Sequence, residues 1–123
     1  MAKKILIVED EELLINLLQR KLSEAGYDVF LARNGEEGMR MMRQENPDIV
    51  LLDIIMPKMG GFEVLEEKAK DDLLKIIPVV VISNSGQPVE LDRAKRLGAS
   101  DWLIKTEFDP QEVLDKVISQ IGK

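Results

Sequence analysis

The sequence predicts an α/β protein in which a five-stranded parallel sheet lies between two layers of helices. Short apolar runs rich in Val and Ile alternate with longer segments of helical periodicity, which is the pattern of buried parallel strands joined by crossover helices. The 123 residues suit a single domain, 1–123, and 45% hydrophobic residues are enough to fill its core. The predicted strands are 3–8, 27–31, 48–52, 77–82 and 101–104, and the predicted helices are 11–25, 35–45, 61–71, 88–97 and 109–121.

Residues at the expected helix ends support these boundaries. The first predicted helix carries apolar residues at 14, 18, 22 and 25 with Leu17 beside them, and Gly26 is placed to end it. Five strand–helix units with right-handed crossovers predict a flavodoxin-like three-layer sandwich with the strand order 2-1-3-4-5. Turn and capping residues mark the other helix boundaries: Asn34, Gly35, Asn46, Pro47, Gly60, Gly61, Pro88, Gly98, Asp109 and Pro110.

Four of the predicted strands end at polar residues that are able to do chemistry. The first runs into Glu9 and Asp10, the third into Asp53, the fourth into Ser83 and the last into Lys105. Ligands of parallel α/β sheets bind outside the carboxyl ends of the strands, near the point where the strand order reverses. We therefore expect these side chains to meet at one edge, with the carboxylates on the two strands that flank the reversal point.

Composition removes several classes of site and partner. The chain has no histidine and no cysteine, which excludes imidazole and thiolate metal ligands, disulfides, and Ser-His or Cys-His catalysis. The net charge of −6 argues against a broad nucleic-acid-binding face, and no apolar stretch is long enough to span a membrane. We expect a cytoplasmic protein with no nucleic-acid partner and no membrane partner.

The carboxylates and the two hydrogen-bond donors suit phosphoryl chemistry. Glu9, Asp10 and Asp53 repel one another and partly protonate unless a hard divalent cation neutralises them, and Mg²⁺ or Mn²⁺ fits such oxygen ligands. Lys105 supplies a positive charge for a phosphoryl oxygen, and Ser83 supplies a hydroxyl donor. Each residue alone has an ordinary explanation as a cap, a turn former or a solvated charge. Their conjunction at four strand ends favours an aspartyl-phosphate site.

Motifs of a known protein family occur around these strand ends. Residues 53–63 have the sequence DIIMPKMGGFE, residues 98–105 have the sequence GASDWLIK, and the first and fourth strand ends are Val8-Glu9-Asp10 and Ile82-Ser83. The first two segments resemble the D-x-x-M-P-x-M-x-G-x-E and G-A-x-D-Y-L-x-K segments of the receiver domain of bacterial two-component response regulators, of the chemotaxis-regulator type. The strand ends are similar to the acidic pair and the Thr/Ser of that family, and the resemblance covers essentially the whole chain.

The resemblance implies how the acidic residues are used. Asp53 is the expected phosphoacceptor, and it takes its phosphoryl group from the phosphohistidine of a sensor histidine kinase or a phosphotransfer protein. Asp10 is expected to bind Mg²⁺ directly and Glu9 to bind it through water. The Asp53 carboxylate and the backbone carbonyl of Ile55 complete the expected protein ligands.

The resemblance also implies a switch, in a signalling domain rather than an enzyme. Lys105 and Ser83 are expected to contact the phosphoryl group, and Trp102 stands where an aromatic residue of the family moves inward. The shift changes the surface of the fourth and fifth strands and helices, which an unknown downstream protein then binds. Catalysis by the domain is limited to its own phosphotransfer and slow dephosphorylation.

Three positions depart from the family pattern. Glu9 replaces the more usual Asp, and Trp102 replaces Tyr or Phe. Thr106 replaces the proline that usually follows the lysine. A cis bond before a residue other than proline costs about 2.5–4 kcal/mol. The sequence therefore predicts either a trans Lys105–Thr106 bond with a rearranged loop, or a strained cis bond held by packing.

Surplus apolar residues in the first predicted helix have two explanations. Leu13 and Ile15 exceed the core stripe of that helix, so either the buried stripe is wide or a hydrophobic patch docks a partner. The residues expected to contact the kinase are Leu13, Leu14, Leu17, Pro57 and Thr106. We expect a monomer or a phosphorylation-dependent dimer through the fourth helix, fifth strand and fifth helix. The charges available on that face are Arg93, Lys95, Arg96, Asp101 and Asp115.

Two other classes of function were weighed against a phosphoacceptor. A haloacid-dehalogenase-type hydrolase also uses Asp and Mg²⁺, but it needs a second acid two residues after the nucleophile, where this chain has Ile55. A phosphorylation-independent interaction module built on the same fold is the remaining alternative. We expect no output domain within this chain, although a domain cut from a larger regulator would have the same sequence.

Overall fold

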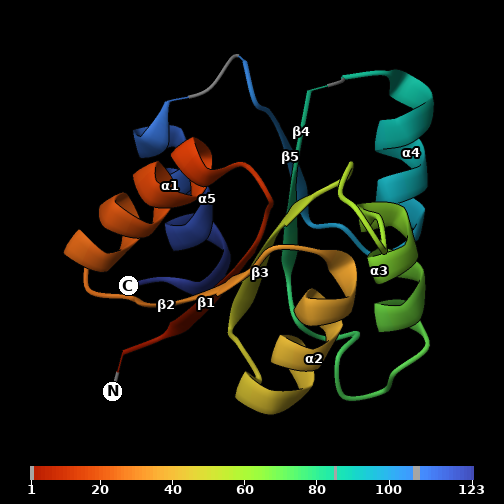
Figure 1. The fold of residues 1–123 in the computed structure, drawn as a ribbon, viewed down its shortest axis with the longest axis horizontal. Helices are drawn as coiled ribbons and strands as arrows, with labels where there is room; N and C mark the ends of the chain where they lie inside the picture. The colour runs from red at the N-terminus through yellow and green to blue at the C-terminus, as the bar shows by residue number, and fades with distance from the viewer. Residues whose placement is uncertain (1, 85, 107–108) are drawn as a thin grey trace.

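A computed structural model describes residues 2–84, 86–106 and 109–123, and these residues fold into five strands that alternate with five helices (Figure 1). The strands are β1 (Lys4–Val8), β2 (Asp28–Ala32), β3 (Ile49–Asp53), β4 (Val79–Ser83) and β5 (Asp101–Ile104). The helices are α1 (Glu12–Glu24), α2 (Gly35–Glu45), α3 (Gly61–Ala69), α4 (Pro88–Arg96) and α5 (Pro110–Ile121).

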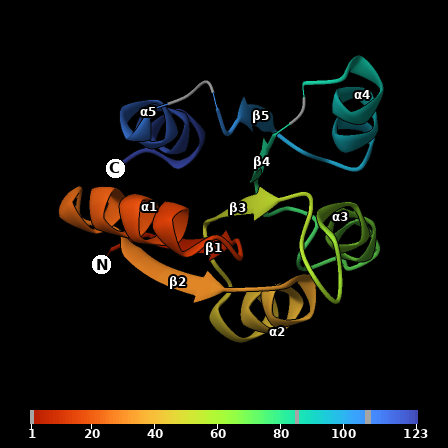
Figure 2. The same cartoon turned by 45° about the horizontal axis from the view of Figure 1, so that its top comes forward.

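The strands form a parallel sheet between two helical layers. The strand order is β2-β1-β3-β4-β5, and every neighbouring pair is parallel. Helices α1 and α5 cover one face of the sheet, and α2, α3 and α4 cover the other (Figures 1 and 2). The predicted flavodoxin-like sandwich and its strand order are confirmed. The reversal point lies between β1 and β3, in the middle of the sheet.

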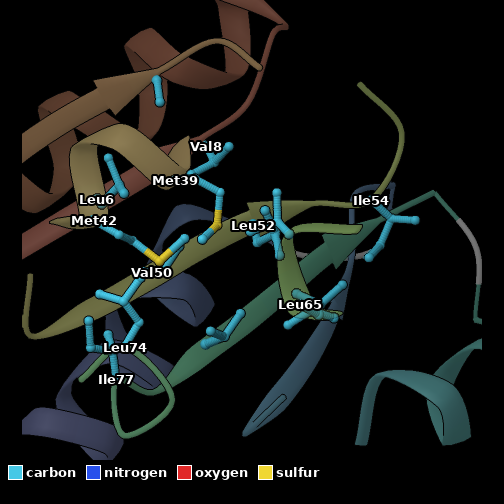
Figure 3. Packing of buried hydrophobic residues seen from close by; sticks show 14 of the residues in the cluster. Leu6, Val8, Met39, Met42, Val50, Leu52, Ile54, Leu65, Leu74 and Ile77 are labelled. Carbon is cyan, nitrogen blue, oxygen red and sulfur yellow. The ribbon is translucent and has the colours of Figure 1, made fainter. Parts of the chain in front are cut away.

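Alternate residues of the buried strands fill the two cores. Successive side chains of a strand point to opposite faces, so each central strand supplies both layers. The core under α1 and α5 receives Ile5, Ile7, Ile49, Leu51, Val80 and Ile82. The core under α2, α3 and α4 receives Leu6, Val8, Val50, Leu52, Val79 and Val81, and Met39 and Met42 from α2 pack against it (Figure 3).

The buried face of α1 differs from the predicted stripe. Ile15 lies outside that stripe but is only 1% exposed, so of the two explanations the wide buried stripe holds for this residue, which forms the buried face of α1 together with Leu18 and Leu22. These residues recur at intervals of three and four, which is the spacing of one helix face. Leu17 is 48% exposed, and Ala25, which was assigned to the stripe, is an exposed residue at the helix C-cap. The stripe is therefore rotated from the predicted one toward Ile15.

Two glycines allow the backbone to pack closely around the end of β3. A Cβ on Gly35 would lie 2.2 Å from the Met59 carbonyl oxygen, and Gly35 N–H donates a hydrogen bond of 3.0 Å to that oxygen. A Cβ on Gly61 would lie 2.4 Å from the Asp53 carbonyl oxygen. Any larger residue would push the β3–α3 loop away, so both glycines fix the backbone that carries Asp53.

None of the helices in the described residues combines the length and the apolar character needed to cross a membrane.

Candidate functional site

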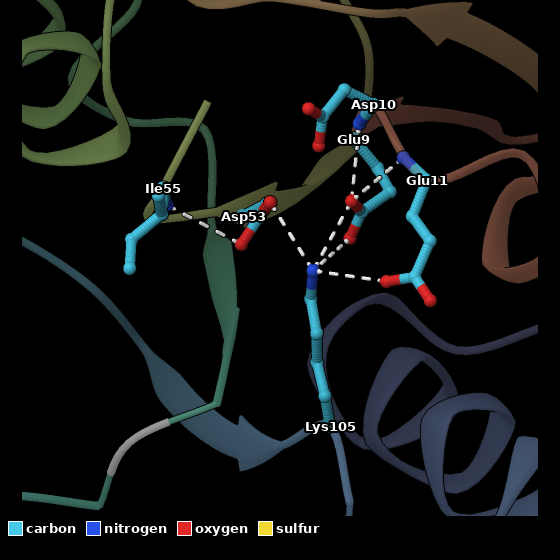
Figure 4. A network of polar contacts seen from close by, with 6 residues as sticks. All are labelled: Glu9, Asp10, Glu11, Asp53, Ile55 and Lys105. Carbon is cyan, nitrogen blue, oxygen red and sulfur yellow. Dashed lines mark hydrogen bonds and ion pairs between the residues drawn. The ribbon is translucent and has the colours of Figure 1, made fainter. Parts of the chain in front are cut away.

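The acidic residues predicted at the strand ends come together at the reversal point of the sheet (Figure 4). Asp53 is the last residue of β3, because this strand ends one residue later than predicted. Glu9 follows the last residue of β1. Carboxylate oxygens of Glu9, Asp10 and Asp53 lie within 4.8 Å of one another, which is close enough to share one cation. Glu9 is 2% exposed and Asp53 is 4% exposed, whereas Asp10 is exposed to solvent.

Lys105 reaches from the end of β5 into this acidic cluster. Its Nζ lies 2.9 Å from Glu9 Oε1 and 3.2 Å from Asp53 Oδ2, and its side chain is 10% exposed. A third carboxylate, Glu11 Oε2, lies 3.6 Å away. Glu11 is not among the predicted site residues, although its place directly after the acidic pair was a signal that it could reach Lys105.

The Glu9 carboxylate also caps its own loop. Glu9 Oε2 accepts hydrogen bonds from the backbone N–H of Asp10 at 3.0 Å and of Glu11 at 3.1 Å, and it accepts one from Lys105 Nζ at 3.2 Å. Glu9 Oε1 is buried, and although it faces Lys105 as an ion pair, no hydrogen bond reaches it from the described residues. One oxygen of Glu9 therefore keeps acceptor capacity toward the centre of the site.

Burial makes the ionised form of these acids unfavourable. Desolvation raises the pKa of Glu9 to about 7, assisted by the negative charge of Asp53 and opposed by the hydrogen bond from Lys105. Desolvation also raises the pKa of Asp53, against the lowering effect of the Lys105 charge. Burial alone would lower the pKa of Lys105, but its hydrogen bond to Glu9 and the charges of Asp53 and Glu9 outweigh burial and raise it. For Glu9, burial therefore raises the pKa more than the negative charge of Asp53 does.

A match over most of the chain identifies the protein family. Residues 5–118 match the response regulator receiver domain. The chain belongs to that family. The alkaline phosphatase synthesis transcriptional regulatory protein PhoP of Bacillus subtilis is 37% identical over 117 residues, which are 95% of this chain and 48% of PhoP. This receiver domain therefore spans about half the length of PhoP.

Solved structures of response regulators have the same fold. The chemotaxis protein CheY4 of Vibrio cholerae superposes with a TM-score of 0.91 at 27% identity, covering 98% of this chain and 99% of CheY4. The phosphorylated cyanobacterial phytochrome response regulator RcpA superposes with a TM-score of 0.83 at 34% identity, covering 97% of this chain and 91% of RcpA. Receiver domains of this kind are signalling domains of two-component systems.

The other predicted site residues of the receiver domain lie on β4 and β5. Ser83 is the last residue of β4 and is 2% exposed, and its backbone carbonyl accepts a hydrogen bond of 2.7 Å from Lys105 N–H. Trp102 is half-buried on β5 and packs against the core on the α4 side of the sheet, where it pairs with Val81. Ile55 presents its side chain to solvent, and its N–H lies 3.4 Å from Asp53 Oδ1.

The missing proline after Lys105 does not displace the lysine from the site. Among the residues that the structure describes no peptide bond is cis, so the Lys105–Thr106 bond is trans. Of the two predicted outcomes, the trans bond is therefore the one that the chain adopts. Lys105 still reaches Glu9 and Asp53 from this backbone.

The residues predicted to dock a kinase differ in exposure. Leu13 is 82% exposed, Leu17 is 48% exposed and Leu14 is half-buried, while Pro57 and Thr106 are exposed. A surface hollow between α1 and the start of α5 begins beside Leu17, and its lining residues are Leu17, Arg20, Lys21, Glu24, Asp109, Pro110 and Gln111. Apolar surface is therefore available on α1 for a partner helix.

Two of the charges predicted for a dimer face, Arg93 and Asp101, form ion pairs within the chain. Lys116 pairs with Asp101 at 2.7 Å, and Arg93 pairs with Glu66 of α3 at 3.0 Å while lying over the Phe62 ring at 4.3 Å. Arg93 therefore ties α4 to α3.

Proposed function

We propose that this receiver domain accepts a phosphoryl group on Asp53 from the phosphohistidine of a sensor histidine kinase or a phosphotransfer protein. An Asp53 carboxylate oxygen forms the new O–P bond while the P–N bond breaks, and the imidazole leaves with the bonding electron pair. The observation that carries the proposal is the meeting of Asp53 with two further acids and Lys105 at the reversal point of the sheet. RcpA, which has the same fold, is known in a phosphorylated form.

The residues present fit a Mg²⁺ ion, with Mn²⁺ as an alternative. Asp10, Asp53 and the Ile55 carbonyl offer hard oxygen ligands, and the free acceptor capacity of Glu9 Oε1 suits a hydrogen bond from a metal-bound water. When bound, the ion neutralises the charge that builds up on the transferring phosphoryl group. The extra length of Glu9 relative to Asp is compatible with a contact through water.

Lys105 and Ser83 hold the phosphorylated form in this proposal. Lys105 already lies 3.2 Å from Asp53 Oδ2, so a phosphoryl group on Asp53 offers it oxygens that carry more charge than the carboxylate. Ser83 ends the strand next to β3 and supplies a hydroxyl donor. Movement of these groups, together with Trp102, shifts the populations of the β4-α4-β5-α5 surface that a downstream protein recognises.

The test is phosphorylation of the purified chain with acetyl phosphate and Mg²⁺, read by intact mass. We expect the wild type to gain one phosphoryl group, Asp53→Asn to gain none, and Asp28→Asn to behave as wild type because Asp28 is an exposed acid on the edge strand β2. The proposal is wrong if no Mg²⁺-dependent adduct forms on the wild type or if the adduct survives in Asp53→Asn. A folded wild type with no adduct would instead identify a phosphorylation-independent interaction module.

A further inference from the structure

A second surface hollow lies at the sheet edge opposite the acidic cluster. Residues from the end of α2 and from the segment 70–78 line it. This segment leads from α3 into β4 (Figure 1). Leu73 is 78% exposed and Ile76 is 77% exposed, both on this segment. We call the surface the loop patch, and its lining residues are Met42, Arg43, Asn46, Asp71, Leu73, Leu74 and Ile76.

The exposure of these apolar side chains is fixed by the way the segment is built. Leu74 and Ile77 of the same segment turn into the core beside Met42, where they are 3% and 5% exposed (Figure 3). Because these two anchors point inward, Leu73 and Ile76 are held outward. Large apolar residues held in solvent beside a hollow are typical of a protein-interaction surface.

Hydrogen bonds make the segment rigid. The Asp71 carboxylate accepts from the N–H of Leu73 at 2.9 Å and of Leu74 at 3.2 Å, and Asp71 O accepts from Lys75 N–H at 2.9 Å. Beneath the segment, Nζ of the buried Lys68 donates to the Lys75 carbonyl at 3.3 Å. A surface held in one shape loses little conformational entropy when it binds a partner.

The charges of the loop patch fit a second copy of the same chain. Arg43 lies 4.0 Å from Asp71, the other charged residue that lines the hollow, so the charges of the lining residues sum to zero in a chain of net charge −6. Two acidic molecules can approach each other here without like-charge repulsion. A strongly basic partner would be drawn instead to the acidic edge around Asp53.

We propose that the loop patch is the contact of a weak, two-fold symmetric homodimer that forms independently of phosphorylation. A two-fold contact joins a surface to itself, so one surface must carry both the protruding and the receiving features. The loop patch does so, because Leu73 and Ile76 protrude beside the hollow and Arg43 lies beside Asp71. In the dimer Leu73 and Ile76 enter the hollow of the other copy, and each Arg43 pairs with the opposite Asp71.

Sedimentation velocity over a range of concentrations tests the proposal. We place the proposed contact in the weak class of interfaces, so we expect half of the chains to be associated at a concentration of about 0.1–1 mM. The weight-average mass should rise with concentration for the wild type and for Asp53→Asn, which separates this contact from any dimer that needs phosphate. Leu73→Asp and Ile76→Asp should remain monomeric, whereas Leu13→Asp, which places a charge at an equally exposed apolar position on α1, should associate like the wild type.

Other results would overturn the homodimer. A concentration-independent monomer up to about 1 mM would do so, since even a weak specific interface associates in that range. Association that persists in Ile76→Asp, or that is lost in Leu13→Asp instead, would place the contact elsewhere. Circular dichroism of each variant ensures that the comparison is made between folded proteins.

Discussion

Two lysines lie at opposite edges of the same sheet, Lys68 buried and Lys105 half-buried, and their surroundings differ completely. Lys105 lies among Glu9, Asp53 and Glu11. Burial alone would lower the pKa of Lys105, but Glu9 and Asp53 outweigh burial, so the pKa rises. Lys68 is 3% exposed on α3, and its Nζ contacts a single neutral acceptor, the Lys75 carbonyl. Desolvation lowers the pKa of Lys68 to about 8.

The difference shows what each cation is suited to do. At the Asp53 edge the acids outnumber the lysine, so Lys105 can exchange one anionic partner for another without leaving its own charge unpaired. A phosphoryl group on Asp53 is such a new partner. Among the residues that the structure describes, Lys68 has no anionic contact, and its burial lowers stability in return for holding the loop patch. The first lysine suits a switch, and the second suits a fixed scaffold.

Removing the charge of Lys105 is expected to have the largest effect. In Lys105→Met the buried carboxylates of Glu9 and Asp53 lose their cation, so we expect the free energy of unfolding at pH 7 without Mg²⁺ to fall by about 3 kcal/mol. The deficit should shrink at pH 5, because both acids have raised pKa values and protonate when unpaired. Urea titrations of the wild type and Lys105→Met at the two pH values measure this loss in the free energy of unfolding.

A surface lysine provides the control for that variant. Lys116 pairs with Asp101 at 2.7 Å, but both side chains are partly exposed, so Lys116→Met should lose less than about 1 kcal/mol. Equal losses in the two variants would mean that the acidic cluster does not depend on Lys105 for neutralisation.

The next largest effect is expected from Mg²⁺, which should raise the free energy of unfolding by binding at the Asp53 edge of the sheet only. Ligand at a hundredfold excess over its dissociation constant adds about 2.7 kcal/mol to stability. We expect a gain of about this size in the wild type, and a larger one in Lys105→Met, where the ion replaces the lost cation. Lys68→Met should respond to Mg²⁺ as the wild type does. A gain unchanged in Asp10→Asn would place the ion elsewhere.

The sequence alone was enough to predict the position of Lys105 but not the burial of Lys68. Parallel strands gather their carboxyl ends at one edge, so the meeting of Lys105 with Asp53 followed from the alternation of strands and helices. Burial of Lys68 did not follow, because a lysine in the last turn of a helix is normally solvated. A signal was present, however, since Lys68 falls three residues after Leu65 and four after Val64, both buried on the same face of α3.

The position of Ile15 shows a second reason why sequence patterns were insufficient. Five of the six residues from Leu13 to Leu18 are apolar, so periodicity alone admitted several buried faces. Only the packing of α1 on the sheet selects the face that contains Ile15 and leaves Leu13 in solvent. The hydrogen bonds of Glu9 to its own loop were likewise invisible, because they depend on how the backbone turns after β1.

Replacing Lys68 with a methionine should stabilise the protein by about 1–2 kcal/mol at pH 7. A shift of one pKa unit corresponds to about 1.4 kcal/mol, so relief from desolvation exceeds the roughly 1 kcal/mol lost with the hydrogen bond to Lys75. Lys70→Met, at an exposed position of the same helix end, should change stability by less than about 0.5 kcal/mol. A destabilised Lys68→Met would mean that the bond to the loop outweighs the cost of burial.

The difference in free energy of unfolding between Lys68→Met and the wild type should narrow as the pH rises. The pKa of Lys68 is about 8 in the folded state, against 10.5 for a lysine in the unfolded chain, so its penalty is complete below pH 8. Between these values the folded wild type has already released the proton that the unfolded chain still holds, and its stability rises with pH relative to the variant.

Urea titrations of both proteins from pH 7 to pH 10 measure the gap, and comparison of the two chains cancels the titration of every group that they share. We expect the advantage of Lys68→Met to fall by about 1–2 kcal/mol over this range. A constant gap would show that Lys68 keeps its proton in the folded state. Lys68 and Lys105 would then both be permanent cations, and the acidic partners of Lys105 would be the main difference between them.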